Sequence, residues 1–165
     1  MRILKYLGLF LFLSLLVTGC KESVDSEADA KLQEAGELHD ASLVSGNEVS
    51  EMLLMTGDLI KQVEMIVPSI EDPIMQGDAD AYITGITVAQ ADFSLWKESL
   101  VEVPGHAHDN SNLGEPHNHD HSMDKAEPAD ILAKQMELKE YIDDIKNRLA
   151  KAIEMSQGVV DEYGN

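Results

Sequence analysis

Three segments of the chain place apolar or small residues at alternating steps of three and four, which is the spacing of one face of an α-helix. They cover about residues 31–67, 78–101 and 128–157. Pro104-Gly105 follows the second segment, and Gly158 follows the third as a predicted stop. No stretch of useful length alternates with a period of two, so the pattern predicts no strand. The chain is therefore predicted to be all-α.

Each segment has a seam of residues that is expected to face the core of an antiparallel bundle. The seams are Leu32, Ala35, His39, Ser42, Gly46, Val49, Leu53, Thr56, Ile60 and Val63; then Tyr82, Ile86, Ala89, Phe93, Trp96 and Leu100; then Ile131, Gln135, Leu138, Ile142, Ile145, Leu149 and Ala152. The first segment contains Ser45-Gly46-Asn47, where a helix is intrinsically weak. A break there would give four helices, and an unbroken segment gives three.

The N-terminus has the three parts of a bacterial lipoprotein signal peptide. Arg2 and Lys5 are basic, and residues 7–17 form an uncharged apolar run that is too short to span a bilayer as a mature helix. Val17-Thr18-Gly19-Cys20 then reads as a lipobox, in which Cys20 is the residue that is lipidated. We therefore expect a lipid anchor at Cys20, the only cysteine of the chain.

This organisation divides the chain into a signal peptide, a lipidated polar tether, a helical bundle that contains a His-rich loop, and a tail. The corresponding ranges are 1–19, 20–30, 31–158 (with the loop at 102–124) and 159–165. The formal net charge is −19, and removal of Arg2 and Lys5 with the signal would make it −21. Such an acidic chain is not expected to bind nucleic acid. Membrane attachment is expected to depend on acyl chains such as palmitate rather than on charge.

The loop between the second and third helical segments is rich in histidine. Five of the six histidines of the chain lie there, namely His106, His108, His117, His119 and His121. In an extended segment alternate side chains share a face, so a His-x-His pair can converge on one cation. Imidazole suits Zn, Cu or Ni ions, and nearby carboxylates can complete a shell. These carboxylates are Asp109, Glu115, Asp120 and Asp124.

The remaining candidates for chemistry favour structural roles. His39 lies on the first seam and is expected to be a hydrogen-bonded core residue. The seven methionines after Cys20 are expected to fill the core, although thioethers also bind Cu(I). The chain has no Gly-x-Ser-x-Gly elbow, no phosphate-binding glycine loop and no His-Glu-x-x-His motif. It is therefore not expected to be an enzyme.

Three short motifs give the chain a resemblance to a known family. With Leu38-His39-Asp40, Trp96 and Ala152-Ile153-Glu154, residues 30–157 resemble small helical cell-envelope lipoproteins of Bacteroidota, often mislabelled as viral A-type inclusion proteins. The family pattern has an acidic residue after His-Asp, where this chain has Ala41. The resemblance implies a helical fold and an outer-membrane location, on either face of that membrane, and no particular activity.

The sequence leaves two functions open. The first is a non-enzymatic, lipid-anchored envelope protein whose acidic His-rich loop binds transition-metal ions. The alternative is a structural or interaction module of the envelope, which meets another envelope protein and in which the loop is incidental.

Overall fold

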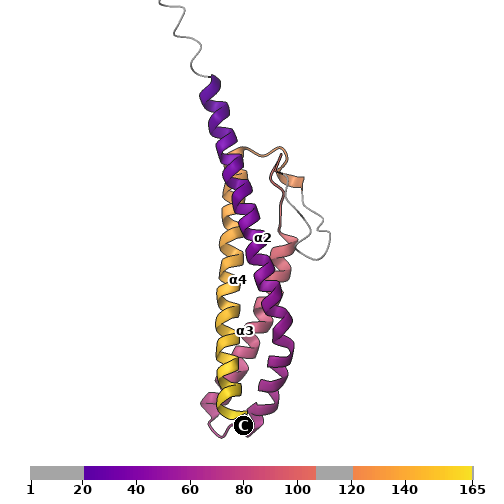
Figure 1. The fold of residues 1–165 in the computed structure, drawn as a ribbon, viewed down its shortest axis with the longest axis vertical. Helices are drawn as coiled ribbons and strands as arrows, with labels where there is room; N and C mark the ends of the chain where they lie inside the picture. Colours follow the sequence, from indigo (N-terminus) through magenta and orange to yellow (C-terminus); the bar gives the residue numbers. More distant parts are fainter. Residues whose placement is uncertain (1–20, 107–120, 165) are drawn as a thin grey trace, which may run out of the picture.

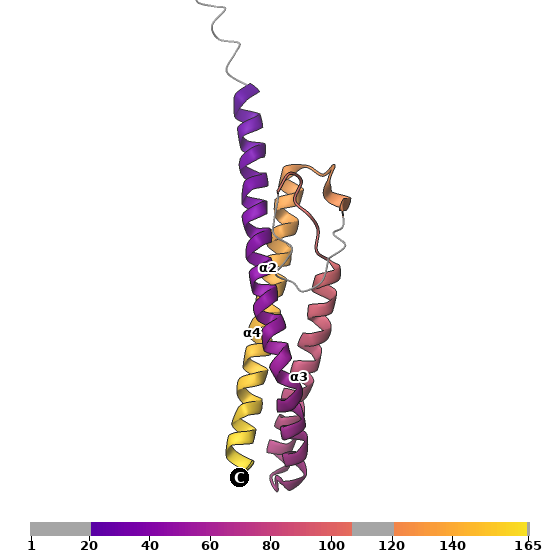
Figure 2. The ribbon, with the colours of Figure 1, turned by 45° about the vertical axis from the view of Figure 1, so that its right-hand side comes forward.

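The structure, a computed structural model, describes residues 21–106 and 121–164. The predicted signal peptide, Cys20 and residues 107–120 lie outside the described residues. Three long helices pack together: α2 (Lys21–Ile66), α3 (Pro73–Glu98) and α4 (Pro128–Tyr163), with short 3-10 helices η1 (Val67–Ser69) and η3 (His121–Met123). As Figures 1 and 2 show, α2 and α4 run in the same direction, and α3 lies beside them and runs in the opposite direction. The all-α prediction is confirmed for this part of the chain.

Helix α2 is continuous through the predicted weak point, so the described residues form three long helices rather than four. Ser45 and Gly46 are both buried there. The Ser45 hydroxyl donates a hydrogen bond of 2.9 Å to Asp143 Oδ1 on α4. Packing against α4 therefore outweighs the low helix propensity of this stretch.

The predicted tether is also helical, because α2 begins at Lys21 rather than at Lys31. Residues 21–30 contain no glycine or proline, and Lys31 donates to Glu27 at 2.9 Å across one turn. This hydrogen bond lowers the pKa of Glu27. In Figure 1 the start of α2 projects beyond the other helices. Packing begins near Leu32, so about 15 Å of helix separates the bundle from the position of Cys20.

Helix α3 begins five residues before its predicted start at Asp78 because two signals set the boundary earlier. The Asp72 carboxylate accepts a hydrogen bond of 2.8 Å from the Ile74 N–H. Pro73 occupies the first helical position, where its missing N–H is not needed. The connection between α2 and α3 therefore consists of η1 and residues 70–72.

Helix α4 does not stop at Gly158, and residues 159–163 of the predicted tail are its last turn. Val159 is 3% exposed and packs with Val63, Ile70 and Ala79. Burial of this valine therefore carries the helix through an unfavourable glycine. Gly158 itself is exposed, and an added Cβ there would meet no atom within 4 Å.

The main hydrophobic cluster surrounds Trp96, which is fully buried. The Trp96 ring stacks on Phe93 with centroids 5.7 Å apart, and its Nε1–H donates to the Leu138 carbonyl at 3.1 Å. All seven seam residues predicted for the third segment are buried. Gly85 lets α3 approach α4 closely, since a Cβ there would lie 3.3 Å from the Ala152 Cβ. The other two predicted seams are buried except for Leu32, Leu53, Ile60 and Tyr82, which are half-buried.

Charged side chains on α4 pair with the other helices in the middle of the bundle. Lys146 pairs with Glu48 of α2, and Arg148 Nη2 lies 2.7 Å from Asp92 Oδ2 of α3. Lys139 pairs with Asp143 on α4 itself. Burial alone would raise the pKa of Asp143, but hydrogen bonds from Lys139 and Ser45 outweigh it and the pKa is lowered. The pairs of Lys146 and Arg148 link α4 to both neighbouring helices.

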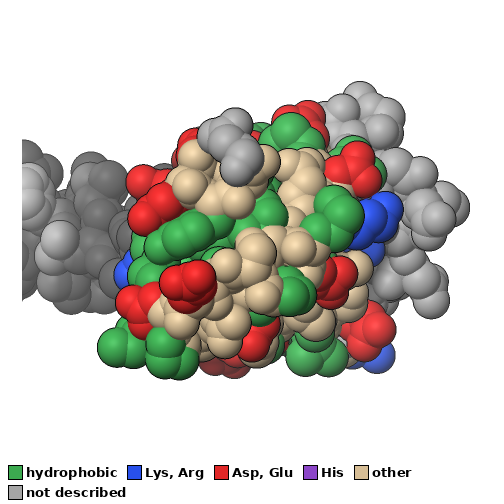
Figure 3. Space-filling view, turned by 90° about the horizontal axis from the view of Figure 1, so that it is seen from below, with side chains coloured by type: hydrophobic (Ala, Val, Ile, Leu, Met, Phe, Trp, Pro, Cys, Tyr) green, Lys and Arg blue, Asp and Glu red, His purple; other side chains and the backbone are tan. Residues whose placement is uncertain are grey.

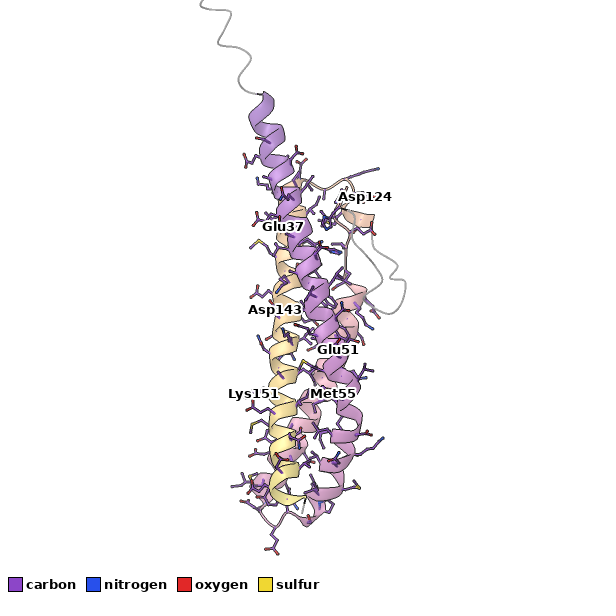
Figure 4. All side chains as sticks on the ribbon, in the orientation of Figure 1. Glu37, Glu51, Met55, Asp124, Asp143 and Lys151 are labelled. Atoms are coloured by element: carbon purple, nitrogen blue, oxygen red, sulfur yellow. The ribbon has the colours of Figure 1, made fainter. Side chains whose placement is uncertain are left out.

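The prediction that the methionines fill the core is wrong for four of them. Met65, Met55, Met136 and Met155 are 73%, 69%, 56% and 39% exposed. Met52, Met75 and Met123 are partly buried and pack against the hydrophobic clusters. In Figure 4, Met55 and Lys151 lie well down the bundle, whereas Glu37 and Asp124 lie near the end from which α2 projects. Among the described helices, none is long and apolar enough to cross a membrane.

Candidate functional site

The His-rich loop begins at the end of the bundle from which α2 projects. Of the predicted metal ligands, His106 is described in full, and His121 begins the helix η3. His108, His117 and His119 lie outside the described residues, as do Asp109, Glu115 and Asp120. The geometry of the site is therefore that of its two ends and of the helices beneath them.

A tight turn presents His106 to helix α2. The His106 N–H donates to the Val103 carbonyl at 3.1 Å, and Gly105 has φ of +77°. Pro104 stands in the second position of this turn and Gly105 in the third, as a type II turn requires. Val103 is buried against Ala35 of α2, which fixes the base of the turn. The sequence Val-Pro-Gly-His thus aims one imidazole at the bundle.

His106 is held by two residues of α2. Its Nε2 lies 3.0 Å from Asp40 Oδ1, and its side chain is 26% exposed. Its ring covers Gly36, where a Cβ would stand only 2.5 Å from His106 Nδ1. Glycine at position 36 is therefore required for the ring to lie this close to the helix.

A second histidine lies directly behind this contact. His39 is fully buried, and its ring centroid lies 6.4 Å from that of His106 in an edge-to-face arrangement. His39 Nδ1 lies 3.4 Å from Gln135 Oε1 on α4, and Gln135 Nε2 donates to the Val101 carbonyl at 3.0 Å. The expectation that His39 is a hydrogen-bonded core residue is confirmed. The chain of contacts joins α2, α4 and the start of the loop.

The proton positions decide what His106 can do chemically in this arrangement. A carboxylate accepts hydrogen bonds and does not donate them, so His106 Nε2 carries the proton that faces Asp40. Only Nδ1 then has a lone pair for a metal, and this atom faces the α2 backbone at Gly36. His106 docks the loop in this position, and it would have to turn away from Gly36 to ligate a metal.

Both ends of the loop are fixed to the bundle at the same level. Leu100 and Val101 belong to the main cluster, and Met123 packs against it from the other end. Within residues 21–106 and 121–164, no group of three or more His, Cys, Asp or Glu side chains is placed to hold a metal ion. The described residues therefore form a platform for the loop rather than a complete metal site.

Sequence reasoning missed the residues that dock the loop. Asp40 and His106 are 66 positions apart, and the His-x-His spacing directed attention to His108 instead. The proline–glycine pair was interpreted only as a helix end. One usable signal was Gly36, a glycine one turn from a seam histidine inside a helical pattern, since such a glycine often marks a close approach.

Comparison with known protein families, with curated proteins and with solved structures finds no match for this chain.

Proposed function

We propose that this chain is a non-enzymatic, lipid-anchored protein of the bacterial cell envelope, attached at Cys20 and facing either side of the outer membrane, whose acidic His-rich loop captures Zn, Cu or Ni ions. The observation that carries the proposal is the contact of His106 with Asp40 and Gly36. It holds the start of the segment that carries His108, His117, His119 and His121 against helix α2. Fixing one end of a segment that carries several ligands lowers the entropy lost when those ligands close on a metal.

The position of the platform fits an anchored protein. It lies at the end of the bundle nearer to Cys20, and the projecting turns of α2 act as a helical spacer (Figure 1). A lipid anchor at Cys20 would hold the loop close to the membrane surface. Replacement of Cys20 by alanine should leave a protein without lipid label that is released by carbonate washing; a labelled, membrane-bound variant would contradict the anchor.

Metal capture is tested by titration calorimetry of the chain from residue 21, which carries all three packed helices, with Zn(II), Cu(II) and Ni(II). Replacing His106, His108, His117, His119 and His121 by asparagine should abolish binding and leave helicity unchanged. Because imidazole must be neutral to ligate, affinity should also weaken on acidification.

A matched variant with Asp109→Asn, Glu115→Gln and Asp120→Asn removes charge but keeps every imidazole, so it should retain most of the affinity. His106→Asn alone should change the affinity by less than about fivefold, because His106 docks the loop and four other histidines remain. Equal affinity of wild type and the five-histidine variant would refute the proposal, as would a wild-type Kd weaker than about 100 μM.

A further inference from the structure

A groove lies between α3 and α4 at the end of the bundle opposite to the projecting part of α2. Its volume is about 670 Å³. The side chains that line it come from the first turns of α3 and the last turns of α4, namely Met75 and Tyr82 with Ile153, Glu154, Met155, Gln157, Gly158, Val159, Asp161 and Glu162. Along α4 the lining spans about 15 Å, which matches roughly ten residues of helix.

The floor of the groove is apolar and partly open to solvent. Val159 is buried, Tyr82 and Ile153 are half-buried, and Met155 is 39% exposed. Met75 completes the floor from α3. Methionine is flexible and polarizable, and it packs against partners of varied shape. Such a floor suits apolar side chains from outside the chain.

The rim of the groove carries only negative charge. Glu154, Asp161 and Glu162 are exposed, and no lysine or arginine lines the groove. The contacts described for Asp161 and Glu162 are with uncharged groups. Gln157 Nε2 donates to Asp161 Oδ1 at 2.9 Å. Glu162 forms a hydrogen bond with Tyr163, and burial together with this hydrogen bond raises the pKa of Tyr163. Residues 51–80 and 151–163 together hold ten acidic side chains and two lysines. Figure 3, seen from this end, shows green and red side chains side by side with little blue.

A glycine keeps the groove open. Gly158 lies inside α4, where glycine is unfavourable relative to alanine, yet no contact within the described chain requires it. A Cβ at position 158 would meet nothing within 4 Å, so the space beside the glycine is the groove itself. A larger side chain would fill this space without disturbing the core.

We propose that this groove docks a cationic amphipathic segment of another envelope protein, with apolar side chains on the floor and Lys or Arg against Glu154, Asp161 and Glu162. Charge complementarity selects this occupant. A second copy would bring a rim of the same sign, and the formal net charge of the chain is −19. The proposal does not depend on metal capture by the His-rich loop.

The test uses a fluorescent helical peptide of about 14 residues made of leucine and lysine, with binding to the chain from residue 21 followed by anisotropy near 0.15 M salt. Two control peptides replace either lysine by glutamate or leucine by serine. The Leu/Lys peptide should bind at least about tenfold more tightly than either control. Equal binding of the Ser/Lys peptide would mean charge attraction alone and would overturn the proposal.

Matched variants locate the binding. Gly158→Leu fills the groove, whereas Gly57→Leu makes the same change at an exposed glycine of α2 with equally open surroundings. The first should weaken binding about tenfold or more and the second less than twofold. Both raise helix propensity, so loss of fold cannot explain the difference.

Charge reversal gives an independent test. Glu154→Lys with Asp161→Lys should weaken binding strongly, and Glu51→Lys with Glu64→Lys, which changes net charge equally on α2, should have a small effect. Equal effects of the two reversals would overturn the proposal. So would a wild-type dimer that Gly158→Leu abolishes, because the occupant would then be a second copy.

Discussion

The two ends of the bundle differ in whether their polar side chains are paired inside the chain or exposed to solvent. Near the projecting part of α2, buried His39 and Gln135 form a chain of contacts to Val101, and further along Lys146 and Arg148 pair with acidic residues of the neighbouring helices. At the far end the acidic side chains of α4 stand on the rim of an open, largely apolar groove. The first arrangement pairs its polar groups within the chain, whereas the second leaves Glu154, Asp161 and Glu162 exposed beside the groove. The comparison contrasts an end that docks a segment of the chain itself with an end at which we propose that a partner docks.

The largest difference in stability between the two ends is expected when a buried side chain is truncated. Trp96 is fully buried and also donates to the Leu138 carbonyl, so Trp96→Ala should lower the free energy of unfolding by about 3–5 kcal/mol. Val159→Ala at the far end removes two carbons and should cost about 2 kcal/mol. Urea unfolding of both variants measures the two losses in the free energy of unfolding. An equal cost at the two sites would contradict the view that the main core lies around Trp96.

A smaller difference is expected for two glutamines of α4. Gln135→Leu leaves the buried Val101 carbonyl without its donor and should cost about 1–3 kcal/mol. Gln157→Leu breaks only an exposed hydrogen bond to Asp161 and should change stability by less than about 0.5 kcal/mol. Urea unfolding separates the two cases. Similar costs would show that the buried contacts of Gln135 add little.

Two glycines should respond in opposite ways to alanine. Gly158→Ala should stabilise the protein by about 0.5–1 kcal/mol, because open space surrounds the added methyl group. Gly36→Ala places its methyl group 2.5 Å from His106 Nδ1 and should displace that ring, offsetting the gain in helix propensity. Thermal unfolding and the NMR signals of the His106 ring follow both effects. An unmoved His106 ring in the Gly36 variant would contradict the docking contact.

The smallest effect concerns acid stability. The lowered pKa of Asp143 means that its contacts with Lys139 and Ser45 stabilise the fold above the ordinary carboxyl pKa. This contribution is lost as the pH falls through the lowered value. Asp143→Asn should therefore cost at most about 1 kcal/mol at pH 7, with the difference from wild type vanishing in acid.

A pH-independent deficit for Asp143→Asn would contradict the assigned hydrogen bonds.

The helical core could be predicted because burial on a helix follows a period that the sequence shows directly. The seam from Ile131 to Ala152 is buried throughout. The methionines illustrate the limit of this reasoning. Met55 was expected to fill the core, but it precedes the seam residue Thr56, and one step along a helix turns the side chain by about 100°. It is therefore exposed.

The ends of the helices and the docking of the loop could not be predicted in the same way. Gly158 indicated a stop, but the burial of Val159 comes from α2, η1 and α3 and is invisible to local propensity. The contact of His106 with Asp40 joins residues 66 positions apart. Only the folded chain brings Asp40, Gly36 and the turn at Gly105 together.

The most direct test of metal capture beside the docking platform is a ¹H–¹⁵N spectrum of the chain from residue 21 during titration with Zn(II). The account predicts the largest changes at residues 107–124, where the ligands lie, and smaller changes at residues 36–40 and 100–106, where the start of the loop is docked. It predicts no change at residues 75–82 and 153–162, which form the groove at the far end. A spectrum that does not change, or changes centred on the groove carboxylates, would contradict capture by the His-rich loop.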